Sequence, residues 1–132
     1  VAPIVSVRKH SGLMVPAPVQ HAMAVALHDT EHVERQRGVY AARRTLLLDA
    51  LTDAGLDVDP DSAAGLYLWV ADPANPTDSW ALVNRLADLG ILAAPGDFYG
   101  TAAHGRVRVA LTATDERVAA AAKRIREAWN VR

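Results

Sequence analysis

The sequence predicts an α/β fold in which one small sheet packs against helices, and two observations support this. The 132 residues are 51% hydrophobic, which is enough for a single domain with one buried core. Segments with apolar residues at helical spacing also alternate along the chain with short segments rich in strand-forming residues. Because no internal repeat or low-complexity segment interrupts this order, we expect one domain over residues 1–132.

Four segments have the spacing of apolar residues that is typical of helices. The second begins after Asp29 or Thr30, either of which can cap a helix. The last has Thr114 as its expected N-cap, with Asp115 and Glu116 in the first turn. The predicted helices are residues 18–28, the residues after Asp29 or Thr30 up to Gly55, residues 78–90 and residues 114–129.

Short segments between these helices have the composition of strands, and the last of them is unusual. Because side chains alternate across a strand, Arg106 and Arg108 share one face of it. The residues on its other face are apolar, namely Val107, Val109 and Leu111. The apolar face is expected in the core, so the two guanidinium groups on the opposite face need an explanation. The predicted strands are residues 56–60, 65–72, 91–96 and 106–113.

The composition excludes several classes of partner. The formal net charge is −1, so no excess of basic residues attracts nucleic acid or an anionic membrane surface. The chain has no cysteine, which excludes disulfides and fits a reducing cytoplasm. No apolar run approaches the roughly 18 residues of a membrane span, and no signal peptide is recognisable. We expect a cytoplasmic protein without nucleic-acid or membrane partners.

Three apparent catalytic or metal-binding motifs are weak. His28 and His32 have the spacing of helical zinc ligands, but a predicted helix break separates them and no third ligand is near. Ser6 and Lys9 match a four-residue pattern of some acyl enzymes, without its companion motifs. The acidic run at residues 57–62 lacks the spacing of a calcium-binding loop. We therefore expect no metal site.

Arg106 and Arg108 are the residues whose pattern most favours a binding site. A single arginine on a strand commonly extends its charge into water, and this interpretation stays open. The preceding loop, residues 95–105, is rich in glycine, however, so its backbone can approach a ligand closely. An arginine beside such a loop can bind a carboxylate through two parallel hydrogen bonds. The pattern indicates an anion site without naming the anion.

Five segments, taken in order, resemble a known family. They are "KHSGLMVPAPVQHAMAVAL", "RGVYAARRTLLLDAL", "GLYLWV", "LADLGILAAPGDFYG" and "GRVRVALTATDERV". They resemble the C-terminal small domain of fold-type I pyridoxal-phosphate aminotransferases, roughly from Lys9 to Trp129, and among subgroups they look most like N-succinyldiaminopimelate aminotransferase. The resemblance implies an α+β domain in which a mostly antiparallel sheet of three to four strands packs against four helices.

The resemblance also implies a substrate site. In that family an arginine on the strand after a Pro-Gly loop holds the α-carboxylate of the substrate, and the matching residue is Arg108. Arg106 lies nearer the start of the strand, where the family varies, and is expected at the rim of the site. Phe98 and Tyr99 of the loop would either line the approach to Arg108 or pack beneath the loop.

The family's cofactor lysine, which is followed at short distance by Gly-x-Arg, has no match here. The lysines of the chain are Lys9 and Lys123, and neither has this context. We therefore expect a fragment that lacks the cofactor-binding large domain, either produced deliberately or left by proteolysis. Such a fragment would hold no catalytic residue, bind no cofactor and be inactive alone.

The complete enzyme would use pyridoxal phosphate, contact its own large domain and form a homodimer. The resemblance implies amino transfer between glutamate and N-succinyl-2-amino-6-oxopimelate in the biosynthesis of diaminopimelate and lysine. The alternative is a freestanding α/β binding or interaction module that has kept this fold and lost catalysis.

Overall fold

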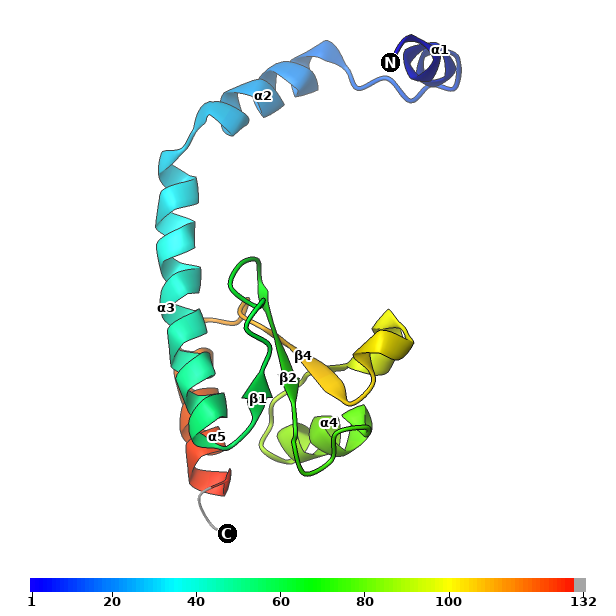
Figure 1. Cartoon of the computed structure of the whole chain (residues 1–132). Coiled ribbons are helices and arrows are strands. Elements are labelled where there is room, and N and C mark those ends of the chain that lie inside the picture. Colours follow the sequence, from blue (N-terminus) through cyan, green and yellow to red (C-terminus); the bar gives the residue numbers. More distant parts are fainter. Residues whose placement is uncertain (130–132) are drawn as a thin grey trace. The chain divides into compact units, whose positions relative to one another are not determined.

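The structure is a computed structural model that describes residues 1–129. Its contacts divide the chain into two compact units, Val1–Gln36 and Arg37–Arg132, and each unit is described by itself. Helix α3 (Glu31–Asp53) runs across the boundary between the units (Figure 1). Within residues 1–129, no helix is both long and apolar enough to cross a membrane.

The first unit contains helices α1 (Ala2–His10) and α2 (Ala17–His28) and the start of α3. Helix α2 matches the predicted helix over residues 18–28 to within one residue. The side chain of Asp29 accepts hydrogen bonds from the backbone N–H groups of Glu31 and His32, at 3.2 and 3.4 Å. Of the two expected capping residues, Asp29 therefore supplies the side chain that caps α3.

Helix α1 lies outside the four predicted helices, and no residue of α1 or α2 is buried. Proline in the first turn of α1 suits a helix because its φ angle is already helical. The β-branched residues Ile4, Val5 and Val7 are weaker helix formers, however, and all three side chains are exposed. Three β-branched residues among nine do not indicate a helix, and residues 2–10 are accordingly not predicted as one.

The second unit is built on a four-stranded sheet with the strand order β1-β2-β4-β3, in which every neighbouring pair is antiparallel. The strands are β1 (Asp57–Val58), β2 (Tyr67–Ala71), β3 (Ala94–Pro95) and β4 (Arg106–Ala110). This confirms the expected small antiparallel sheet. Strands β1 and β3 are shorter than the predicted 56–60 and 91–96, and at β3 Pro95 has no N–H to donate to the ladder.

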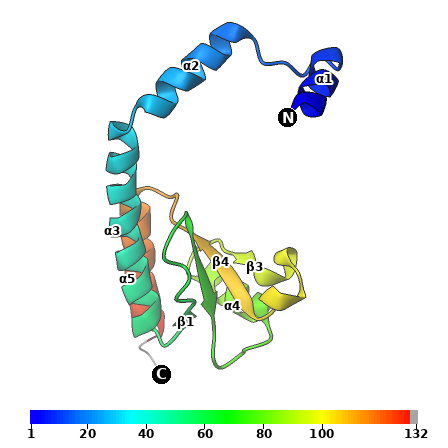
Figure 2. The same cartoon turned by 45° about the horizontal axis from the view of Figure 1, so that its top comes forward.

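One face of the sheet forms the core with α3, α4 (Ser79–Asp88) and α5 (Asp115–Trp129). Leu68 and Val70 of β2 and Val107 and Val109 of β4 point into this core and are at most 5% exposed. Buried residues of the three helices complete it, namely Leu47, Ala50, Leu51, Leu82, Leu86, Val118, Ala122 and Ile125. Figures 1 and 2 both show α3 and α5 side by side next to the sheet.

Local hydrogen bonds fix the starts of α4 and α5 in this arrangement. Asp78 caps α4 by accepting a backbone N–H at 3.0 Å. Thr114 accepts the N–H of Arg117 at 3.5 Å, which confirms Thr114 as the capping residue of α5. The Nε of Arg43 on α3 donates to Asp115 at 2.6 Å, so the two neighbouring helices are also joined by an ion pair.

Candidate functional site

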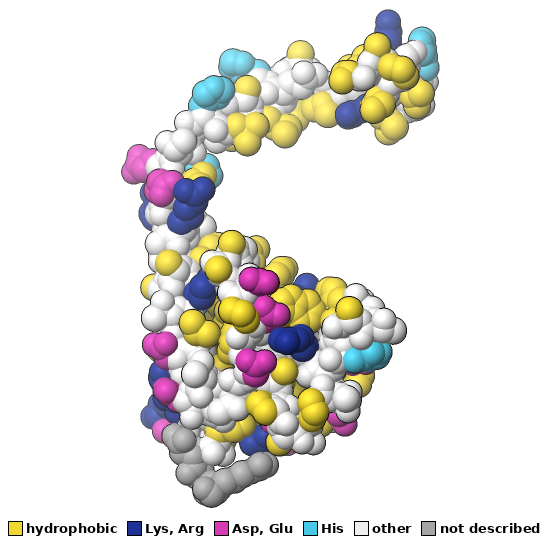
Figure 3. Space-filling view, in the orientation of Figure 1, with side chains coloured by type: hydrophobic (Ala, Val, Ile, Leu, Met, Phe, Trp, Pro, Cys, Tyr) yellow, Lys and Arg dark blue, Asp and Glu magenta, His cyan; other side chains and the backbone are white. Residues whose placement is uncertain are grey.

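The face of the sheet opposite the core carries Arg106 and Arg108, as the alternation along β4 predicts. Arg108 lies directly opposite Trp69 of β2 and Ala94 of β3. Directly paired residues of antiparallel strands project from the same face of a sheet. Arg108 therefore has neighbours from both adjacent strands. Figure 3 shows charged and hydrophobic side chains next to one another on the surface of this unit.

Aromatic rings surround the guanidinium group of Arg108. Its Cζ lies 4.1 Å from the ring centre of Tyr67 and 5.2 Å from that of Tyr99. The Tyr99 ring meets Trp69 edge to face, with 5.3 Å between ring centres and 88° between planes. A cation near an aromatic face is attracted by the quadrupole of the ring. The rings therefore restrain the guanidinium group without neutralising its charge.

No carboxylate within residues 1–129 pairs with Arg108, and its buried Nε has no hydrogen-bond partner in this part of the chain. Arg106 Nη1 is also buried without a hydrogen-bond partner among these residues, but it lies 3.5 Å from Asp59 Oδ2, within ion-pair distance of a carboxylate. A buried donor without a partner costs free energy, so a ligand that accepts a hydrogen bond from Arg108 is favoured at this position. The planar fork of donors on arginine suits the two oxygens of a carboxylate.

The loop between β3 and β4 consists of two short 3-10 helices, η1 (Gly96–Tyr99) and η2 (Thr101–Ala103). Tyr99 reaches the guanidinium group of Arg108, whereas the Phe98 ring lies 6.0 Å from that of Trp80 on α4. Phe98 is 69% exposed and Tyr99 is 46% exposed. Of the two loop residues singled out in the sequence, Tyr99 thus lies at Arg108 and Phe98 lies at the neighbouring helix.

Tyr67 and Trp69 belong to the site, although the sequence analysis assigned them only to a strand. Their outward position follows from alternation with the buried residues Leu68 and Val70. Their position beside Arg108 depends on the pairing of β2 with β4, which joins residues far apart in the sequence. The alternation along β2 indicates that Tyr67 and Trp69 share one face of the sheet. That this face lies beside Arg108 follows only from the register of β2 with β4.

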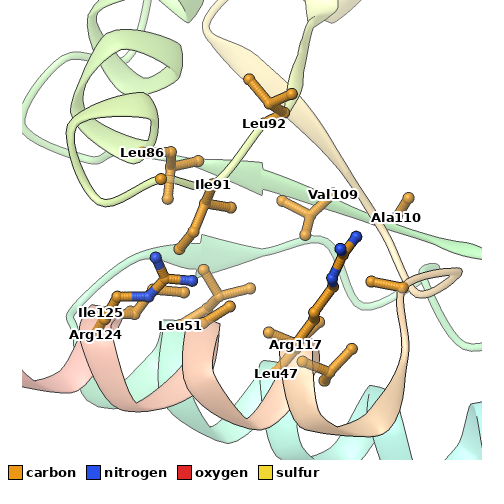
Figure 4. Close-up of a pocket in the computed structure, with 14 residues that line it drawn as sticks. Leu47, Leu51, Leu86, Ile91, Leu92, Val109, Ala110, Arg117, Arg124 and Ile125 are labelled. Atoms are coloured by element: carbon orange, nitrogen blue, oxygen red, sulfur yellow. The ribbon is translucent and has the colours of Figure 1, made fainter.

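A separate cavity of about 400 Å³ lies among α3, α5, β4 and the segment after α4. Its lining is mostly aliphatic, and Arg117 and Arg124 of α5 point toward it (Figure 4). Arg108 and its aromatic neighbours do not line this cavity. The cavity is therefore no part of the candidate site.

Residues 6–125 match the family described as aminotransferase class I and II. The chain belongs to this aminotransferase family. The chain is 57% identical over 122 residues to 4-dedimethylamino-4-oxo-anhydrotetracycline transaminase OxyQ of Streptomyces rimosus, covering 92% of the chain and 33% of OxyQ. It is 56% identical over 127 residues to the probable aminotransferase Rv1178 of Mycobacterium tuberculosis, covering 95% of the chain and 29% of that relative.

A more distant relative is LL-diaminopimelate aminotransferase 2 of a Nostoc species, 36% identical over 107 residues, which are 80% of this chain and 27% of that protein. Among solved structures, aspartate aminotransferase from Thermus thermophilus with maleate is similar with a TM-score of 0.75 and 30% identity, over 92% of this chain and 32% of that one. These likenesses confirm the expected aminotransferase fold. The chain spans about a third of the length of the curated relatives it matches.

Aminotransferases of this family use pyridoxal phosphate, which a lysine holds as a Schiff base. The residues of this chain do not supply that lysine at the candidate site. Lys123 lies on α5, where it is 74% exposed and 3.7 Å from Glu127, and Lys9 lies on the exposed helix α1. The described residues therefore do not fit the cofactor, and we assign them no step of its chemistry.

Proposed function

We propose that this chain is the C-terminal small domain of a pyridoxal-phosphate-dependent aminotransferase, in which Arg108 binds the α-carboxylate of the amino-acid or 2-oxo-acid substrate. The observation that carries this proposal is the state of the Arg108 guanidinium group. It is restrained by Tyr67 and Tyr99 and has no acidic partner within residues 1–129. A positive group that is oriented but not neutralised is prepared for an anionic ligand.

The Thermus aspartate aminotransferase was solved with maleate, a dicarboxylate, and its similarity to this chain supports a carboxylate as the ligand class. A carboxylate bound to the Arg108 guanidinium group would supply the acidic partner that residues 1–129 do not provide. Two parallel hydrogen bonds would fix the direction of the substrate as well as its position. Tyr99, at the edge of the loop, would limit access of water to these hydrogen bonds.

For the complete enzyme we propose amino transfer between glutamate and N-succinyl-2-amino-6-oxopimelate. The LL-diaminopimelate aminotransferases among the relatives act, by name, on a molecule that shares the diamino-diacid skeleton, which supports this substrate class. The remaining two thirds of the enzyme would supply pyridoxal phosphate and its lysine. The enzyme would act in the cytoplasm as a homodimer.

The test is replacement of Arg108 in the complete enzyme. Each charge-assisted hydrogen bond is worth about 1.5–3 kcal/mol, so Arg108→Ala should cost about 3–5 kcal/mol in kcat/KM, a loss of roughly hundreds- to thousands-fold. Arg108→Lys should recover only part of the loss, because a point charge does not reproduce the fork. Steady-state kinetics with a range of amino donors measures both effects.

Arg106→Ala is the matched control, since Arg106 lies on the same strand face and is already paired with Asp59. Its effect on kcat/KM should stay within about 1 kcal/mol, as for a partly exposed ion pair. If Arg106→Ala abolished turnover and Arg108→Ala preserved it, the assignment of the carboxylate to Arg108 would be wrong.

A further inference from the structure

Asp97 and His104 lie at opposite ends of the segment that presents Tyr99 to Arg108. Asp97 belongs to η1, and His104 directly follows η2. The Nδ1 of His104 lies 2.5 Å from Asp97 Oδ1, so the two side chains join the ends of the loop. A hydrogen bond between an imidazole N–H and a carboxylate is stronger than one between neutral groups.

Ser79 of α4 contacts the segment that carries the Asp97–His104 pair. It is the first residue of α4, is 2% exposed, and accepts the backbone N–H of Gly105 at 2.9 Å. The hydroxyl of Ser79, together with His104, lowers the pKa of Asp97 below its ordinary value, so the carboxylate is charged at neutral pH. The second oxygen, Asp97 Oδ2, is buried without a hydrogen-bond partner within residues 1–129, although the Asp97 side chain as a whole is 30% exposed.

Few buried apolar side chains hold this loop in place. The ring contacts of Tyr99 with Trp69 and of Phe98 with Trp80 support it. A Cβ built at Gly96 would lie 1.9 Å from the carbonyl oxygen of Ala103. Gly96 is the only residue of η1 that is buried, and η2 buries none. Gly100, which joins the two short helices, has a φ of 102°, a conformation that is easy for glycine alone. A segment with so few buried apolar contacts opens at low free-energy cost unless polar contacts restrain it.

We propose that Asp97 and His104 are positioning residues, whose hydrogen bond holds Tyr99 against Trp69 and Arg108 and thereby sets the affinity of Arg108 for the carboxylate of the substrate. The inference rests on the function proposed above for Arg108. Tyr99 is two positions from Asp97 and lies within the closed segment, so release of either end would free its ring. A freed Tyr99 would remove one of the two cation–π contacts of the guanidinium group and leave the contact with Tyr67.

The three tryptophans of the chain allow a direct test of the loop. Trp69 contacts Tyr99 and Trp80 contacts Phe98, whereas the Trp129 ring contacts Arg85. With 5-fluorotryptophan in the 132-residue chain, we expect Asp97→Ala and His104→Leu to shift the ¹⁹F signals of Trp69 and Trp80. The Trp129 signal should stay in place and reports that the core remains folded.

Two further variants sharpen this measurement. His104→Asn retains a donor near the position of Nδ1 and should restore the wild-type signals of Trp69 and Trp80, unlike His104→Leu. Asp49→Ala removes the same charge from an exposed position of α3 and should shift none of the three signals. If Trp69 and Trp80 kept their wild-type signals in both Asp97→Ala and His104→Leu, the proposal would be overturned.

Kinetics of the complete enzyme test the consequence for substrate. Arg108 would hold the substrate carboxylate equally in the bound substrate and in the transition state. Weakening this contact by Asp97→Ala should therefore raise KM by about five- to tenfold and change kcat by less than about twofold. A wild-type KM in Asp97→Ala, alongside a large defect in Arg108→Ala, would overturn the positioning role. A wild-type kcat/KM in Arg108→Ala would instead remove the proposed function, and the ¹⁹F signals would still decide whether the pair holds the loop.

Discussion

Arg106 and Arg108 are two positions apart on one strand, yet their surroundings give them different roles. Arg106 lies at the start of β4 opposite Ala71, and its charge is balanced by Asp59. Arg108 lies opposite Trp69, between two tyrosine rings, and its charge is not balanced within the described residues. The same side chain therefore serves as a surface ion pair at one position and as a candidate ligand-binding group at the other.

The pKa of Asp97 provides a prediction at the scale of one residue. The Ser79 hydroxyl and His104 lower it from the ordinary value of 3.8. Because the folded chain holds this carboxylate charged more strongly than the unfolded chain, the contact contributes stability above the ordinary pKa. That contribution is lost as the pH falls through the lowered pKa of the folded state.

We expect a ¹³C NMR titration of the Asp97 carboxyl to have its midpoint below 3.8. Ser79→Ala removes the first of the two causes, so it should move that midpoint upward toward the ordinary value. A midpoint above 3.8 in the wild-type chain would show that burial outweighs these hydrogen bonds, and would contradict the prediction.

At the scale of the element, the start of β4 depends on close packing against the turn before α4. Gly105 has a φ of 76°, and a Cβ built there would lie 1.8 Å from the carbonyl oxygen of Pro76. The same glycine donates its N–H to Ser79 at 2.9 Å. The backbone of the loop thus approaches the turn at Pro76 more closely than any side chain would allow, and its N–H at Gly105 reaches the Ser79 hydroxyl.

Gly105→Ala should therefore destabilise the chain by more than the roughly 1–2 kcal/mol that a left-handed residue costs, because the added methyl group also collides with the backbone. Gly55→Ala is the matched control: its φ is 75°, and a Cβ there would meet nothing within 4 Å. Urea unfolding followed by circular dichroism measures both free energies. An equal loss in the free energy of unfolding for the two variants would contradict this prediction, because it would show that the turn at Pro76 moves to make room for the methyl group.

At the scale of the whole molecule, the first unit exposes more apolar surface than an isolated protein normally does. Val19, Met23 and Leu27 follow one another at helical spacing on α2 and are 47%, 55% and 78% exposed. Neither α1 nor α2 buries a residue, and Figure 3 shows hydrophobic side chains along this unit. A helix with so much exposed apolar surface is typical of an interaction surface.

We expect the 132-residue chain to self-associate at high concentration through α2 or through the loop at residues 95–100. The double variant Met23→Glu and Leu27→Glu should weaken this association, because it places two charges in the apolar stripe. His21→Glu with Ala24→Glu adds the same charge on the other side of the helix and should weaken it less. Light scattering measures the mass, and a strict monomer at about millimolar concentration would count against an interaction surface here.

The sequence alone determined the type of most elements, because local patterns specify them. Alternation along residues 106–111 placed Arg106 and Arg108 on the face opposite the core, and Thr114 marked the start of α5 through a hydrogen bond within one helical turn. The helices α2, α4 and α5 follow from apolar spacing in the same way. Helix α1 is not predicted, because three of its nine residues are β-branched and such residues are weak helix formers.

Only the tertiary structure decided the composition of the site. Tyr67 and Trp69 become neighbours of Arg108 through the pairing of β2 with β4, and strand register depends on how both strands fit one core. Asp97 meets His104 because the chain reverses between them at Gly100, and Ser79 of a separate helix accepts the N–H of Gly105, the residue after His104. A sequence pattern reports the period of one segment, whereas these contacts arise from the packing of several segments on one sheet.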